Sequence, residues 1–150
     1  MYCCISYTII GYKFTFGIAF YMVFVSEMSF IALLCPFCIC VLLSQFCRIF
    51  DNYLSNAVYH TPAGGEIRIT LREFNNALRL SVFNSGDRIP DDMRGKIWIE
   101  AFTTKDEISE KNAGLGLYIV KEISLLEDTD CGFFNRPDGV EFWFDFIGLE

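Results

Sequence analysis

Two glycines separated by one leucine, Gly114 and Gly116, directly precede an apolar helical pattern. Apolar side chains then recur at the spacing of one helix face, at Leu115, Ile119, Ile123 and Leu126. Glycine at a helix start lets the backbone approach a ligand, and the first N–H groups of the helix are free to donate to it. Because a helix N-terminus favours negative charge, these residues indicate a phosphate site. Taken alone, the pattern also fits an ordinary loop.

Two asparagines and a histidine, Asn52, Asn56 and His60, recur one turn apart within a helical pattern. Asparagine has no propensity advantage inside a helix, so the pair requires an explanation. One explanation is a solvated polar face. The other is a pair of amide oxygens directed at a metal ion, since Mg²⁺ takes hard oxygen ligands. Composition alone favours the solvated face.

Three helices are expected to position these residues, over 48–60, 91–99 and 115–126. The second is a short helix that carries Ile97 and Trp98 inward. The first has an apolar face made by Phe50, Leu54, Ala57 and Val58.

Two strand pairs accompany the helices. Period-two alternation over 66–72 and 78–82 predicts a hairpin with one solvated face. Residues 131–134 and 140–146 form the second pair, with a strong turn signal between them. The polar run 103–113 ahead of the glycines is either a plain surface loop or a mobile lid.

The composition changes abruptly near residue 48. Residues 1–47 contain two charged side chains, Lys13 and Glu27, and six of the seven cysteines. From Arg48 onward the chain has the composition of an acidic mixed domain of about 100 residues, which is large enough to bury a core. The formal net charge of −7 argues against a nucleic-acid-binding surface. We therefore expect two parts, 1–47 and 48–150.

The apolar segment 1–47 has two explanations. Met28 to Cys47 is a run of 20 residues without a charge, which is long enough to cross a bilayer as a helix. The segment can therefore be a helical membrane anchor. A frameshifted or misassigned start of the chain would give a similar composition. The cysteines lie in an apolar run, which indicates neither a disulfide framework nor a closed zinc site.

Five motifs from 48–150 resemble, in order and spacing, those of sensor histidine kinases. They are Asn52-Tyr53-Leu54-Ser55-Asn56-Ala57 with Thr61-Pro62 (N box), Asn84-Ser85-Gly86 with Ile89-Pro90 (G1 box), Glu100-Ala101-Phe102 (F box), Gly114-Leu115-Gly116-Leu117 with Ile119-Val120-Lys121 (G2 box) and Gly139-Val140-Glu141-Phe142 (closing strand). Each motif is weak alone, and the ordered set is strong. The family is the ATP-binding domain shared by histidine kinases, gyrase-type topoisomerases and related chaperones.

The resemblance implies an α+β fold, a two-layer α/β sandwich of the Bergerat type. Its helices would lie on one face of a mixed, mostly antiparallel sheet, with ATP between the helices and the lid. The family's sheet normally also receives a strand pair before the N-box helix, and residues 1–47 supply no obvious one. By the same resemblance, Asn56 would coordinate Mg²⁺ and Asn52 would support it.

The remaining site residues are also implied by the resemblance. His60 stands where the family often has an aromatic or histidine near the nucleoside. Asn84 replaces an aspartate that reads the adenine amino group, and an amide can still accept through its oxygen. The other candidates are Gly86 and Ile89 beside the base, Phe102 as lid anchor, Lys105 as phosphate contact, and Gly114, Leu115, Gly116 and Leu117 around the phosphates. Departures from the family's pattern are Tyr59, Arg88 and Asn112.

The function implied is phosphoryl transfer from Mg-ATP to a histidine on another domain or chain. The only histidine, His60, lies inside the N box, so a phosphoacceptor hairpin and a response regulator would act in trans and the chain would be a truncated kinase. It would work at the cytoplasmic face of the membrane, or free in the cytoplasm if 1–47 are an artefact. The alternatives are a non-catalytic nucleotide-binding or docking module and an anti-sigma-type Ser/Thr kinase of the same fold.

Overall fold

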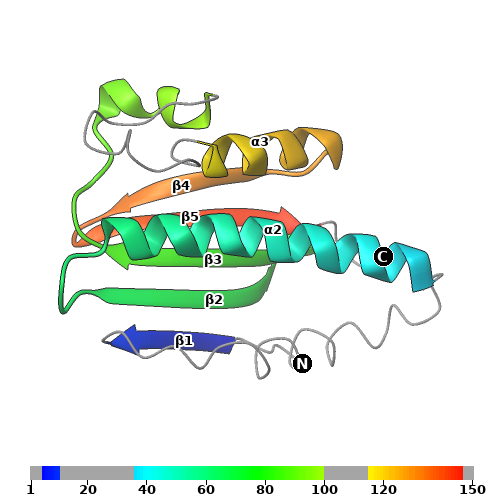
Figure 1. The fold of residues 1–150 in the computed structure, drawn as a ribbon, viewed down its shortest axis with the longest axis horizontal. Coiled ribbons are helices and arrows are strands. Elements are labelled where there is room, and N and C mark those ends of the chain that lie inside the picture. The colour runs from blue at the N-terminus through cyan, green and yellow to red at the C-terminus, as the bar shows by residue number, and fades with distance from the viewer. Residues whose placement is uncertain (1–4, 11–35, 100–114, 147–150) are drawn as a thin grey trace.

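The computed structural model describes residues 5–10, 36–99 and 115–146. It has two layers, a five-stranded sheet and the helices α2 (Pro36–His60) and α3 (Gly116–Leu126), which lie on one face of it (Figure 1). The expected two-layer α+β sandwich is confirmed. All pairings among the described strands are antiparallel, so the mixed component that we expected is not found in this part of the chain.

Two hairpins form most of the sheet. In spatial order the strands are β1 (Ile5–Ile10), β2 (Glu66–Phe74), β3 (Ala77–Ser85), β5 (Gly139–Phe146) and β4 (Cys131–Arg136). The β2–β3 turn places Asn75 and Asn76 at positive φ angles of 50° and 62°. A two-residue turn that matches the strand twist needs such angles, and asparagine tolerates them. Both predicted hairpins are therefore confirmed, with β3 paired to β5 between them.

The strand β1 corrects our expectation that the apolar N-terminal segment is helical and offers no strand ahead of the N-box helix. Its six residues pair antiparallel with Glu66–Leu71 of β2. The sequence Ile5-Ser6-Tyr7-Thr8-Ile9-Ile10 is rich in β-branched residues, which favour strands. This short signal was hidden in a long apolar run. Residues 36–47, by contrast, are helical as expected.

The helix α2 begins at Pro36 instead of Arg48. Phe46 is 4% exposed and Leu43 packs against the same core, so the abrupt change in composition falls inside a packed helix. The uncharged stretch 28–47 ends in this core helix. Among the described residues, no helix combines the length and the hydropathy that crossing a membrane requires. The division between 47 and 48 stays a prediction from composition.

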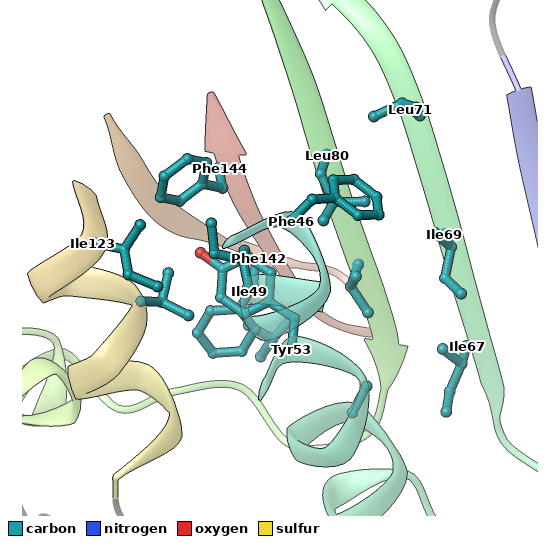
Figure 2. Close-up of a cluster of buried hydrophobic side chains, with 14 residues drawn as sticks. Phe46, Ile49, Tyr53, Ile67, Ile69, Leu71, Leu80, Ile123, Phe142 and Phe144 are labelled. Atoms are coloured by element: carbon teal, nitrogen blue, oxygen red, sulfur yellow. The ribbon is translucent and has the colours of Figure 1, made fainter. Parts of the chain in front are cut away.

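The buried side of α2 is rotated from the predicted one. Its inward residues are Phe46, Ile49, Tyr53 and Ala57, which pack on apolar residues of β2, β3 and β5. Figure 2 shows the first three of them facing the sheet. The predicted residues Phe50, Leu54 and Val58 flank this stripe and are half-buried. Tyr53 can occupy the centre because its hydroxyl donates to the Trp143 carbonyl oxygen at 2.9 Å.

The other two predicted helices also differ in detail. In α3 the buried residues are Val120, Ile123 and Ser124, whereas Leu126 is 82% exposed and does not belong to the inward face. The expected helix over 91–99 is two 3₁₀ turns, Asp91–Met93 and Lys96–Trp98. Ile97 and Trp98 pack against the core as predicted.

The sheet face opposite the helices is not solvated on β3. Arg79, Ser81 and Phe83 alternate with the core residues of this strand and are buried. The Arg79 guanidinium donates to both Asp145 carboxylate oxygens, at 2.5 and 2.6 Å. It also stacks between Phe74 and Trp143, with its carbon 3.8 and 4.0 Å from the ring centroids. A planar guanidinium bonded on its edge and stacked on both faces explains how this charge is buried.

Phe46 provides a test of the longer domain helix. We expect Phe46→Ala to lower the free energy of unfolding of the full chain by about 3 kcal/mol, because it leaves a cavity between α2 and the sheet. Denaturant unfolding followed by circular dichroism measures this. The neighbouring Cys47→Ala serves as control, since Cys47 is exposed and its change is expected to stay within about 0.5 kcal/mol. Equal stability of the two variants would contradict the packing of Phe46.

Candidate nucleotide-binding site

The side chains of Asn52, Asn56 and His60 follow the edge of α2. Asn52 and Asn56 are half-buried and His60 is exposed. They stand beside the buried stripe formed by Ile49, Tyr53 and Ala57, so packing of that stripe sets the direction in which the amides project. Burial raises the pKa of the Tyr53 hydroxyl well above its usual value, so this group stays a neutral hydrogen-bond donor.

The start of α3 lies against the first of these asparagines. A Cβ atom added at Gly116 would lie 3.1 Å from Asn52 Oδ1. Only glycine therefore leaves the Asn52 amide undisturbed at this separation. The N-cap residue of α3, Leu115, makes no side-chain capping hydrogen bond, and the first N–H groups of a helix point outward from its N-terminus. The structure thus brings an amide oxygen next to a helix N-terminus, an arrangement that suits a phosphate and its metal ion.

The turn after β3 lies against the other end of α2. Gly86 has φ +137°, and a Cβ there would lie 2.8 Å from the His60 carbonyl oxygen. Asn84 precedes it on the helix-facing side of β3 and is 2% exposed. Its described side-chain contact is one long hydrogen bond from Nδ2 to the Ser85 carbonyl oxygen, at 3.4 Å. A buried amide with so weak a partner retains capacity for a ligand.

An open hollow of about 230 Å³ lies beside this turn. It is lined by Tyr59, His60, Thr61, Pro62, Gly86 and Asp87. The hollow brings together His60 and Gly86, two of the residues that the resemblance implies for the base end of the site. Eight residues of helix separate Asn52 from His60, which is about 12 Å. The two glycine turns therefore contact the same helix two turns apart.

Ile89 is held by a residue that sequence reasoning missed. Its N–H donates to Asn135 Oδ1 at 3.0 Å, and its carbonyl oxygen accepts from Asn135 Nδ2 at 2.8 Å. Asn135 lies in β4, between Phe134 and Arg136, and no motif marks it. Residue spacing could not have revealed the pair, which joins positions 46 apart in the chain.

Phe102, Lys105 and Gly114 lie outside the described residues, as does Asn112. Leu115 and Leu117 flank Gly116 at the start of α3 and are half-buried. The two described free cysteines, the exposed Cys47 and the half-buried Cys131, have pKa values raised above the ordinary one, chiefly by partial desolvation. Both thiols are therefore protonated near neutral pH and unsuited to nucleophilic catalysis.

The family model for the histidine kinase-, DNA gyrase B-, and HSP90-like ATPases matches residues 43–148. The chain belongs to this family. Within this broad family, the chain is similar to sensor histidine kinases. Residues 43–148 therefore form an ATP-binding catalytic domain of the histidine kinase type.

Sensor protein VanSB of Enterococcus faecalis is 36% identical over 100 residues, which are 65% of this chain and 22% of that protein. The chain therefore spans less than a quarter of this relative's length.

Solved structures of histidine kinases share the fold. The catalytic domain of histidine kinase ThkA superposes with a TM-score of 0.62 at 32% identity, covering 70% of this chain and 67% of that one. ThkA in complex with its response regulator protein TrrA gives 0.58 at 28% identity, over 71% of this chain and 29% of that one. Full-length ShkA in complex with AMPPNP gives 0.56 at 28% identity, over 70% and 22%.

Gly86 offers a test of the contact between the turn and α2. We expect Gly86→Ala to destabilise the chain by about 1–3 kcal/mol, because a side chain is strained at this positive φ and would press on the His60 carbonyl. Gly95→Ala is the matched control, since φ is −83° there and the added Cβ meets nothing within 4 Å. Thermal unfolding compares the two variants, and a tolerated Gly86→Ala would refute the close approach.

Proposed function

We propose that this domain binds Mg-ATP along α2 and supports transfer of the γ-phosphoryl group to a histidine on another domain or chain. The observation that carries the proposal is the placement of both glycine turns on one helix. Gly116 meets α2 at Asn52, and Gly86 meets it at His60. A nucleotide has its base at one end and its phosphates at the other. A site in which one glycine lies close to each end of the same helix segment matches that shape.

The residues at the two ends would do different work. At the Gly116 end, the Asn52 and Asn56 amide oxygens suit Mg²⁺, and the first N–H groups of α3 suit phosphate oxygens. The metal ion would neutralise phosphate charge when bound. At the Gly86 end, the Asn84 amide would hydrogen-bond the base. Lys105 and Phe102 remain candidates from sequence for a phosphate contact and a lid anchor. The contribution of this chain is positioning and electrostatic stabilisation.

The phosphoacceptor would come from elsewhere. His60 is the only histidine of the 150 residues, and it lines the hollow beside Gly86. We therefore propose a phosphoacceptor hairpin domain and a response regulator as partners in trans. The structure of ThkA with its response regulator TrrA supports the second partner by analogy. Use of ATP favours action at the cytoplasmic face. Residues 5–10 and 36–47 belong to the sheet and to the core helix α2, so the composition of 1–47 does not by itself favour membrane attachment.

Asn56 tests the magnesium side of the site. We expect Asn56→Ala to weaken Mg²⁺-dependent binding of a fluorescent ATP analogue to the full chain by about tenfold or more, because an oxygen ligand is lost. Titration of the analogue with and without Mg²⁺ measures this. Ser55→Ala is the control on the same turn, since the exposed Ser55 hydroxyl bonds only backbone carbonyls of α2 among the described residues.

The outcomes separate the candidate functions. If the unaltered chain shows no Mg²⁺-dependent binding at millimolar protein, the nucleotide proposal fails. If it binds but forms no radiolabelled phosphohistidine on a hairpin domain added in trans, the chain is a nucleotide-binding module without transfer activity. Tyr59 motivates that second candidate, because among the described residues this exposed aromatic lines the hollow and no lysine or arginine does.

A further inference from the structure

The turn that follows β3 is fastened to the β4–β5 hairpin at three points. The Gly86 N–H donates to the Asp138 carbonyl oxygen at 3.1 Å. Arg88 Nη2 donates to the Pro137 carbonyl oxygen at 3.3 Å. Ile89 is the third point, where the Asn135 amide bonds both the N–H and the carbonyl oxygen.

The third attachment, at Ile89, fixes the orientation of the backbone as well as its position. Its two hydrogen bonds lie between one planar side-chain amide and one backbone residue, at 3.0 and 2.8 Å. Two bonds to a plane restrict both the position and the orientation of the Ile89 backbone. The partners also settle the orientation of the amide, because a backbone N–H can only donate and a carbonyl can only accept.

The sheet register places Asn135 in line with Asn84. Asn135 pairs with Val140 on β5, and Val140 pairs with Asn84 on β3. Directly paired residues share a face, so the row continues the helix-facing side on which Asn84 is buried. Two strand spacings separate the two asparagines, or about 10 Å. The turn leaves β3 after Ser85, crosses the end of β5 and is held by Asn135 on β4.

Apart from these hydrogen bonds, burial does little to order the outer part of this turn. The Ile89 side chain packs against the core, which holds its inner side. Asp87, Arg88 and Pro90 are exposed, so their burial cannot order the backbone. The Asn135 amide is therefore the described group that fixes the Ile89 backbone relative to Gly86 and Asn84.

We propose that Asn135 is a positioning residue for the nucleotide, acting through the backbone of Ile89. It touches no ligand itself. By holding the turn two strands away from β3, it keeps Gly86 against α2 and fixes the wall of the site beside the buried Asn84 amide. This inference depends on the proposed nucleotide site.

Asn135→Asp gives a test that separates positioning from bulk stability. An ionised carboxylate can still accept from the Ile89 N–H, but it repels the carbonyl oxygen that Asn135 Nδ2 now contacts. A protonated carboxyl can donate to that oxygen and restores both bonds. We expect Mg²⁺–ATP-analogue affinity of the full chain to fall about tenfold at pH 7.5 and to recover toward wild type as the pH is lowered to about 4, where an aspartate carboxyl becomes protonated.

Asn75→Asp is the matched control. It adds the same charge in an exposed turn at the opposite end of β3, at a φ of 50° that aspartate tolerates. The charged neighbours of the turn, Asp87, Arg88, Arg136, Asp138 and Glu141, are the same in wild type and both variants. The ratio of variant to wild-type affinity at each pH therefore reports on the new carboxyl alone. Amide hydrogen exchange at Ile89, expected to be faster in Asn135→Asp at pH 7.5, supplies a second readout.

Each outcome is decisive. Absence of binding by the wild-type chain defeats the proposed function, and this inference with it. Wild-type binding with an unchanged affinity of Asn135→Asp defeats only the inference. A loss of affinity that does not recover at low pH, or one shared by Asn75→Asp, also defeats it, because a general loss of stability or a charge effect would then explain the result.

Discussion

Burial of one side of α2 against the sheet determines where the polar side chains of that helix stand. Ile49, Tyr53 and Ala57 are almost fully buried, and they leave little rotational freedom to a helix of this length. Asn52, Asn56 and His60 therefore occupy a fixed edge. Both turns can approach α2 this closely because Gly116 and Gly86 have no side chain. A Cβ atom at either position would press on an atom of the helix. The geometry of the candidate site is thus a consequence of core packing, with few contacts of its own.

Local sequence signals were sufficient for much of this arrangement. Alternation over 66–72 and 78–82 located the first hairpin, and two adjacent asparagines that tolerate positive φ explain its turn. The helix spacing of Asn52, Asn56 and His60 placed them on one edge. The ordered motifs alone indicate the family. The hairpin and the helix edge depend on residues within one or two turns or one strand pair of one another, whereas the family was indicated by the order of motifs along the whole domain.

The features that sequence reasoning missed depend on distant partners. The rotated buried side of α2 includes Tyr53, whose hydroxyl is satisfied by the Trp143 carbonyl oxygen, 90 positions away in the chain. Burial of Arg79 requires Phe74, Trp143 and Asp145 from neighbouring strands. The strand β1 could not be recognised from the sequence, because a short β-branched run within a long apolar segment resembles part of a membrane anchor. Asn135 carries no local signal, and only the register of three strands brings it into line with Asn84.

The arrangement of the strands has a consequence for how the chain assembles. The β2–β3 and β4–β5 hairpins close through two-residue turns, whereas β3 and β5 join residues as far apart as Leu78 and Phe146. Closing the longer loop costs more chain entropy, so the hairpins are favoured to form before they dock. The turn held by Asn135 bridges them and exists only after docking. A ligand bound there would stabilise the junction by mass action, and so couple occupancy of the turn to the last step of folding.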